Sequence, residues 1–250
     1  MQYIYAYETT ASAPASQFQN FLEKSILSVK EQYLYLLLSI REVANFVETD
    51  AKIKAGKHIK NEKDKNFNTK LLSNVIIQYL NNDKEFELEV KNAGVASLLD
   101  DDNIRQLYKK MTDAKEYNEY LTNGLEFNVE EDRAIVTFLL DNILLEDENF
   151  STNMDELFTN WMDDAEFVIE AVHEVIQKSK NQLKLHLEKG NLKDKFKELT
   201  QFGIDLFNET ISNKKEHYKI IEPKLKNWET DRLAIIDVIL IRMAVSEFLY

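Results

Sequence analysis

Glu170 and His173 have the spacing of a helical metal site. Di-iron centres in helical bundles use a Glu-x-x-His pair on each of two helices and a single glutamate on each of two others. The other histidines, His58, His186 and His217, have no glutamate three residues before them. Half of the ligand set is therefore missing. We expect no metal, and we expect the acidic residues around Glu170 to form the solvent-exposed face of a helix.

Other catalytic patterns are also missing from the sequence. A serine nucleophile on a strained turn has the pattern G-x-S-x-G, which does not occur. Loops that hold phosphate groups need clustered glycines, whereas the five glycines here are isolated. Cysteine is absent, which removes disulfides, thiolate metal sites and cysteine nucleophiles. We therefore expect neither an enzyme nor a cofactor.

A set of charged residues interrupts an apolar helix near the carboxyl end of the chain. The helix is predicted to begin near Thr230 or Asp231, and its apolar residues recur at steps of three and four. This predicted core stripe contains Ile235, Ile236, Ile239, Leu240, Met243 and Phe248. Asp237 and Glu247 each lie five residues from Arg242, which is not the spacing of surface ion pairs on a helix. Arg232, Asp237 and Arg242 are therefore candidates for contacts elsewhere.

Aromatic residues give two further signals. Trp161 and Trp228 have helical spacing relative to their apolar neighbours, which favours core positions, although indole rings can also stack on bases. Tyr3, Tyr5 and Tyr7 follow one another in steps of two, so they lie on different faces of a helix. We expect at least one of these tyrosines to be exposed.

Composition predicts an all-α protein. The 250 residues are 44% apolar, enough for a substantial core, and they include only five glycines and two prolines. Long uninterrupted helices are therefore expected. No run of eighteen apolar residues and no signal peptide is found, so we expect a cytoplasmic protein without a membrane span.

Charge is distributed unevenly along the chain. The net charge is −13, and residues 1–194 carry all of it, with 22 Lys and Arg against 35 Asp and Glu. Residues 195–250 have nine of each sign and a local basic strip formed by Lys214, Lys215, Lys219, Lys224 and Lys226. Such a strip is either a solvated helix face or a contact with a polyanion.

The apolar periodicity predicts a succession of helices. The expected ranges are 1–8, 17–56 as one helix or two abutting ones, 69–81, a helix from about 103 that carries Ile104 to Met111, a short helix through Tyr117 and Leu121, 130–145, 151–176, 192–221 and 230–250. The segment 83–98 contains an alternating stretch that resembles a strand, but short helices and a loop are favoured. Asp102 or Asn103 is expected to cap one helix, and Ser151 or Thr152 another. Asn142 is expected to face inward.

The carboxyl-terminal segment resembles a known family. Residues 228–247 read W-x-x-D-R-L-A-x-x-D-x-x-x-x-R-x-A-V-x-E, which is similar to the fifth helix of the NusB family of transcription antitermination factors. The stretch from Phe202 to Trp228 resembles the two preceding helices of that family. At the amino end, MQYIYAYE resembles the close of the family's first helix, V-Q-A-L-Y, with Gln2 and Tyr5 at matching places.

The resemblance implies a NusB-like multi-helix bundle with a large helical insertion after the first helix, as in the enlarged Bacteroidetes-type proteins. Residues 1–10 and 195–250 would form the NusB-like core, and residues 11–194 the insertion. The implied function is non-catalytic. Such a protein binds the boxA element of nascent ribosomal RNA together with the ribosomal protein NusE, and acts within the RNA polymerase antitermination complex.

The resemblance also implies roles for individual residues. Gln2, Tyr5, Arg232 and Asp237 are expected to contact RNA or NusE. Arg242 and Glu247 are expected to fix helix packing, since buried charges need partners.

Two further expectations follow from the comparison with the family pattern. The Arg-rich amino-terminal arm and the last two helices of the family are not seen in the sequence, which predicts a fragment with weak RNA affinity. A different hypothesis is a non-catalytic protein-interaction scaffold in which the acidic helical insertion performs the function.

Overall fold

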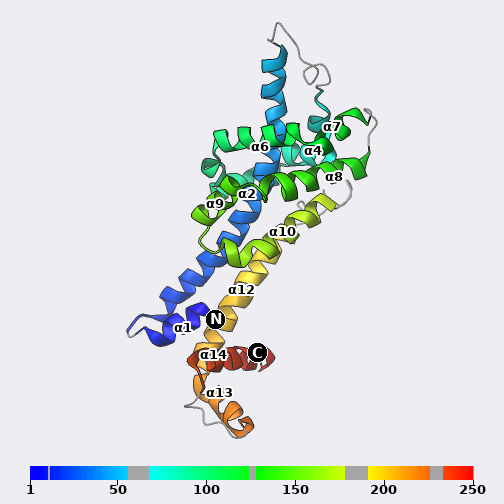
Figure 1. The fold of residues 1–250 in the computed structure, drawn as a ribbon. Helices are drawn as coiled ribbons and strands as arrows, with labels where there is room; N and C mark the ends of the chain where they lie inside the picture. The colour runs from blue at the N-terminus through cyan, green and yellow to red at the C-terminus, as the bar shows by residue number, and fades with distance from the viewer. Residues whose placement is uncertain (11, 56–67, 124–127, 178–190, 226–232, 250) are drawn as a thin grey trace. The chain divides into compact units, whose positions relative to one another are not determined.

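The computed structural model describes residues 1–10, 12–55, 68–123, 128–177, 191–225 and 233–249 (Figure 1). Within these ranges every regular element is a helix, so the predicted all-α fold is confirmed. The chain divides into two compact units. The first contains Met1–Leu27 and Leu192–Tyr250, and the second contains Ser28–Asn191. None of the described helices combines the length and apolar character that a bilayer crossing requires.

The longest element is α2 (Ala15–Ala55), a single continuous helix (Figure 1). It contributes to the first unit up to Leu27 and to the second unit from Ser28 onward. Every residue from 32 to 40 is buried, so this segment has no solvent-facing side. A helix that is buried all round needs neighbours in every direction. The middle of α2 is therefore the central element of the second unit.

Ten further elements build the described part of the second unit. They are η1 (Lys70–Ser73), α4 (Val75–Asn82), α5 (Lys84–Ala93), η2 (Val95–Leu98), α6 (Asp101–Asp113), α7 (Lys115–Thr122), α8 (Val129–Phe138), η3 (Leu139–Leu144), α9 (Glu148–Leu157) and α10 (Trp161–Gln177). Segment 83–98 is thus helical, as predicted, and the strand-like alternation within it is not a strand. Trp161 is buried, as predicted, whereas Trp228 lies outside the described residues.

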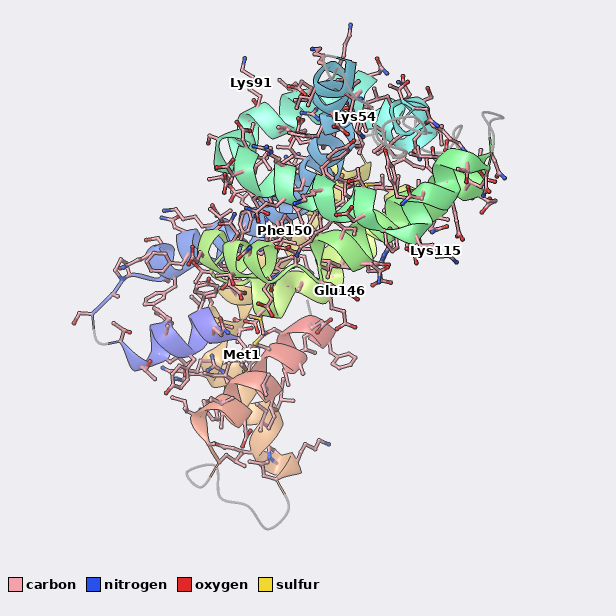
Figure 2. All side chains as sticks on the ribbon, turned by 45° about the horizontal axis from the view of Figure 1, so that its top comes forward. Met1, Lys54, Lys91, Lys115, Glu146 and Phe150 are labelled. Atoms are coloured by element: carbon pink, nitrogen blue, oxygen red, sulfur yellow. The ribbon has the colours of Figure 1, made fainter. Side chains whose placement is uncertain are left out.

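Aromatic rings connect α2 to its neighbours in this unit. The Tyr35 ring lies 6.1 Å from that of Phe150 and 5.6 Å from that of Phe158. The Phe46 and Tyr108 rings are 5.1 Å apart. Figure 2 shows Phe150 among the helices, whereas Lys91 and Lys115 lie on the outside. Such ring pairs contribute about 1 kcal/mol each beyond the area they bury.

Two predicted helix starts are wrong. The side chain of Asp100, not of Asp102 or Asn103, accepts the N–H that begins α6. Asp147 caps α9 by accepting the Phe150 N–H at 2.8 Å, so Ser151 and Thr152 lie inside the helix. Several neighbouring polar residues can cap a helix, and their types alone do not indicate which of them does. The chain is extended at Phe158, where α9 ends before α10 begins.

The helix predicted over 130–145 changes character after α8. Residues Leu139–Leu144 form η3, a π-helix in which each turn contains more residues than in an α-helix. The prediction that Asn142 faces inward is therefore wrong, and this residue is exposed. Asp141 of η3 contacts α10, since Nε2 of His173 lies 2.8 Å from Asp141 Oδ1.

The first unit is smaller. Besides the start of α2 it contains α1 (Gln2–Thr9), α12 (Asn191–Ser212), α13 (Lys214–Ile221), η4 (Glu222–Lys224) and α14 (Ile235–Leu249). Its core cluster brings together Ile4, Phe18, Phe207 and Ile239 from four different helices. The predicted helix at residues 1–8 is confirmed as α1. Phe21, near the start of α2, is exposed.

Candidate RNA and partner interface

The side of α14 that faces the first unit's core contains polar residues. Val238, Ile239, Arg242 and Ser246 are buried and recur at steps of three and four, so they share one face of the helix. Arg242 and Ser246 are thus part of the buried face, although they interrupt the apolar sequence. Their burial requires partners within the unit, because an unpaired buried charge is strongly unfavourable.

Arg242 finds these partners on two other helices. Its guanidinium is fully buried and forms an ion pair with Glu8 of α1. A second guanidinium nitrogen, Nη2, donates to the carbonyl oxygen of Thr210 near the end of α12. The arginine therefore connects α14 to α1 and α12. Its Nε has no hydrogen-bond partner among the described residues.

Glu8 receives a second cation from α13. Lys214 Nζ lies 3.0 Å from Glu8 Oε2 at the beginning of that helix. Burial alone would raise the pKa of the Glu8 carboxyl group, but the hydrogen bonds from Arg242 and Lys214 outweigh burial and lower the pKa below its ordinary value. Glu8 is therefore ionised in the folded protein and connects α1 to α13 and α14.

A hydroxyl and imidazole cluster adjoins the arginine. Thr210 donates its hydroxyl to the Leu206 carbonyl at 2.7 Å, and Ser246 donates to the Arg242 carbonyl at 3.0 Å. Ser246 Oγ lies 3.1 Å from Thr210 Oγ1 and 3.4 Å from Nε2 of the buried His217. Burial lowers the pKa of His217, and the nearby positive charge of Arg242 lowers it further. The imidazole is therefore held in its neutral form.

The candidate binding residues lie on the surface of the same unit. Gln2 and Tyr5 are exposed on α1, and 39% of the Tyr5 surface remains accessible, in agreement with the prediction that one of the first three tyrosines is exposed. Asp237 is exposed in the first turn of α14, which packs against α1. Arg232 lies outside the described residues. Binding roles for these four residues stay predictions.

The two residues expected to fix packing have different surroundings. Arg242 is buried and paired, whereas Glu247 is exposed and forms no ion pair with a described residue. The exposed position of Glu247 gives that half of the prediction no support. An exposed carboxylate keeps its hydration and needs no partner.

The prediction that the whole apolar stripe of α14 is core is wrong for the described residues. Ile239 is buried, but four members of the stripe are exposed by 42% to 90%: Ile235, Ile236, Leu240 and Phe248. This helix is apolar on nearly every side, so periodicity alone does not indicate which side faces the core. The hydrogen-bonded polar residues Arg242 and Ser246 mark that side instead.

Glu8, Thr210 and His217 were not identified from the sequence. The useful signal was Arg242 itself, because a charge inside an apolar helix requires an acidic partner. That partner lies 234 positions away, and no spacing rule connects two residues so far apart. Only the packing of α1 against α14 brings them together.

No group of three or more histidine, cysteine, aspartate or glutamate side chains in the described ranges could hold a metal ion. Within these ranges His173 contacts Asp141.

Comparison with known proteins gives one match. The model of the NusB family matches residues 162–250, a range that includes nearly all of α10 and the whole of α12, α13 and α14. No curated protein and no solved structure matches the chain significantly. The matched range contains Arg242, Ser246, His217 and Asp237. Residues 162–250 of this chain are therefore similar to the NusB family, which supports a general role in transcription antitermination and RNA binding.

Proposed function

We propose that this protein binds boxA-type RNA of nascent ribosomal RNA transcripts together with the ribosomal protein NusE. It would act in the cytoplasm as part of the RNA polymerase antitermination complex. The observation that carries this proposal is the NusB family match over residues 162–250. In the proposed division, residues 1–10 and 195–250 are the NusB-like core, and residues 11–194 are an insertion.

The surface of the first unit supports the proposal. Gln2, Tyr5 and Asp237 are exposed on α1 and α14, two helices that pack together, and we assign them to the RNA and NusE interface. Arg232 precedes α14 in the sequence and would add a cation for phosphate contacts. Exposed Lys215 and Lys224 provide further positive charge in a unit without the large acidic excess of residues 28–191.

The test is charge reversal at Asp237. A ternary complex of this protein, NusE and a boxA-type RNA is expected to weaken at least about tenfold on Asp237→Lys, because reversal replaces an attraction with a repulsion at the partner surface. Asp205→Lys is the matched control, since Asp205 is an exposed aspartate on α12 of the same unit. If the unsubstituted protein forms no ternary complex, or if Asp237→Lys and Asp205→Lys weaken the complex equally, the proposed interface is wrong.

One observation favours an additional function as a protein-interaction scaffold. Residues Ser28–Asn191 form a compact unit with its own buried core. If the scaffold function dominates, the full-length protein will capture the same partners whether or not Asp237 is replaced by lysine. Sensitivity of partner capture to Asp237→Lys therefore separates the two functions.

A further inference from the structure

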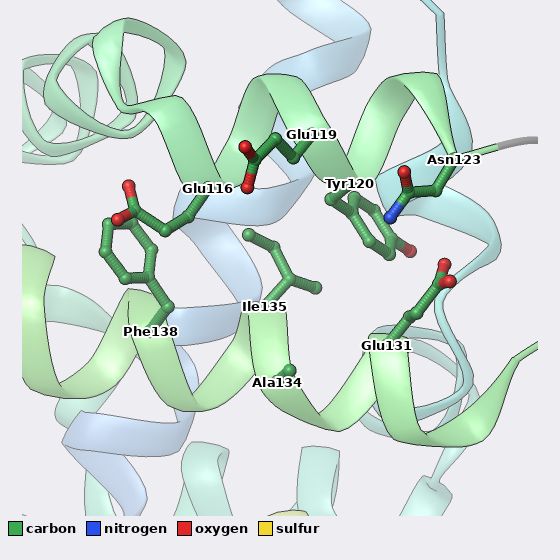
Figure 3. Close-up of a pocket in the computed structure, with 8 residues that line it drawn as sticks. All are labelled: Glu116, Glu119, Tyr120, Asn123, Glu131, Ala134, Ile135 and Phe138. Carbon is green, nitrogen blue, oxygen red and sulfur yellow. The ribbon is translucent and has the colours of Figure 1, made fainter.

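The second unit contains a pocket between α7 and α8 with a volume of about 230 Å³ (Figure 3). Sites for small-molecule ligands and cofactors have volumes of roughly 300–1,000 Å³. This pocket is smaller, so it suits a single long side chain better than a cofactor. Its lining residues precede the range that matches the NusB family and are not part of the proposed RNA interface.

The lining combines an apolar floor with an acidic rim. Ala134, Ile135 and Phe138 of α8 supply apolar surface. Glu116 and Glu119 extend from α7, and Glu131 extends from the beginning of α8 (Figure 3). An apolar stem that ends in a positive charge matches this arrangement. Among protein side chains, lysine and arginine have that structure.

Tyr120, which lines the pocket, is held in place by hydrogen bonds to residues outside the pocket. The Tyr120 hydroxyl donates to Asp132 Oδ1 at 2.7 Å, and Asp132 Oδ2 accepts the Val75 N–H at 2.8 Å. Lys70 Nζ lies 4.3 Å from the centre of the Tyr120 ring, so this ring already binds an ammonium group of the chain itself. A pocket with fixed walls loses little entropy when it is occupied.

The rim keeps a negative charge after its internal pairs are counted. Glu131 pairs with Lys70 at 3.2 Å, and Glu119 pairs with Lys115 at 2.9 Å. Glu116 forms no ion pair with a described residue, so three glutamates face two lysines. The Lys115 pair is largely exposed and contributes at most about 1 kcal/mol, so another cation can replace it.

The segment that surrounds the pocket is negatively charged, like the rim of the pocket. Residues 28–191 contain 20 Lys and Arg against 32 Asp and Glu, a net charge of −12. Such a charge attracts cationic partners over distances near the Debye length of about 8 Å and repels nucleic acid. Charge complementarity therefore indicates a basic polypeptide as the occupant of the pocket.

We infer that the pocket between α7 and α8 is a docking site for a lysine- or arginine-rich segment of a partner protein. One basic side chain lays its stem over Ala134 and Phe138 and places its charge beside Glu116 and Glu119. The site is separate from the RNA-binding surface proposed above, because its residues lie in the second unit and the proposed interface residues lie in the first.

The experiment measures binding of a fluorescent peptide of alternating lysine and alanine to the full-length protein by anisotropy. A second peptide replaces each lysine with diaminopropionic acid, which keeps the ammonium group but lacks most of the stem. The lysine peptide is expected to bind at least about threefold more tightly, because only its stem covers the apolar floor. Equal binding of the two peptides, or no binding of the lysine peptide, would overturn the inference.

Substitutions in the protein test the position of the site. Ala134→Lys fills the pocket with a cation and is expected to weaken the lysine peptide at least about tenfold. Glu116→Gln is expected to weaken it about threefold, whereas Glu130→Gln, which removes an exposed glutamate outside the pocket on α8, leaves binding unchanged. If the Ala134→Lys variant does not fold, the comparison of Glu116→Gln with Glu130→Gln still tests the position of the site. Equal effects of Glu116→Gln and Glu130→Gln would show general charge attraction and contradict a site at this pocket.

Discussion

At the scale of single residues, the ion pair between Glu8 and Arg242 dominates the first unit. Both side chains are buried, and each cancels a charge that would otherwise be unpaired in the interior. The pair can be compared with the exposed Lys115 and Glu119 of the second unit, which remain hydrated and stabilise the fold much less. The contribution of an ion pair to the stability of the fold therefore depends on how deeply the pair is buried.

Glu8→Gln is expected to lower the free energy of unfolding by about 3 kcal/mol at neutral pH, because it leaves the Arg242 guanidinium buried without a counter-charge. Urea denaturation monitored by circular dichroism measures this change. Asp205→Asn, at an exposed position of the same unit, is the control and should alter the stability by less than about 0.5 kcal/mol. A Glu8→Gln effect as small as that of the control would show that the pair does not stabilise the unit.

His217 predicts a dependence of stability on pH. Its pKa in the folded protein is lower than in the unfolded chain, so between these two values the unfolded state binds more protons. Stability should therefore fall as the pH decreases through about 6.5, the ordinary histidine value, until the folded imidazole is also protonated. Urea denaturation at about pH 7.5 and about pH 5.5 should show this loss, and His217→Gln should reduce it. A loss of equal size in the variant would assign the effect to other groups.

The sequence indicated that Arg242 needs a buried acidic partner but did not identify that partner. An arginine inside an apolar helix predicts a buried acid, and the resemblance to a family assigned Arg242 to packing. The acid is Glu8 at the other end of the chain, whereas Glu247, also expected to fix packing, is exposed. Local spacing contains no information about contacts across more than two hundred residues.

At the scale of elements, helix periodicity predicted the existence of most helices and failed at their ends and faces. The 41-residue α2 and the helical nature of 83–98 follow from spacing and from the scarcity of glycine and proline. The caps at Asp100 and Asp147 were missed because neighbouring polar residues compete for the same role. The position of Asn142 was missed because a π-helix changes the period.

Gly94 ends α5 in the left-handed conformation, with φ of 70°. Gly94→Ala is expected to lower stability by about 1 kcal/mol, because a Cβ is unfavourable at this backbone angle. Nothing lies within 4 Å of the added carbon, so the cost is conformational and not steric crowding by neighbours. Gly94→Asn is the control and should cost less, since asparagine tolerates this conformation. Thermal denaturation measures both, and equal losses would contradict this account.

At the scale of the whole molecule, the chain contains two units with separate cores. The first unit holds α12 to α14 of the matched range together with α1, and the second holds the acidic helical segment, which includes α10 of the matched range. The sequence indicated this contrast through the concentration of negative charge in residues 1–194. It did not place the start of α2 in the first unit, because that depends on the packing of Phe18 against Phe207 and Ile239.

Separate cores predict separate responses to a local substitution. Glu8→Gln should accelerate amide hydrogen exchange in residues 1–10 and 197–221, and leave exchange in α4, α6 and α8 of the second unit unchanged. Hydrogen exchange read out by mass spectrometry on the full-length protein tests this prediction. Equal acceleration in both units would show that they unfold together.

The central claim is that the chain recognises RNA as a NusB family protein does. Its most direct test is the affinity of the protein and NusE together for a boxA-type RNA, compared with an RNA of the same composition in permuted order. The account predicts at least about tenfold tighter binding of the boxA sequence at one fixed salt concentration, since phosphate contacts alone do not distinguish the two RNAs. Equal affinity for both RNAs, or no binding of either, would contradict it.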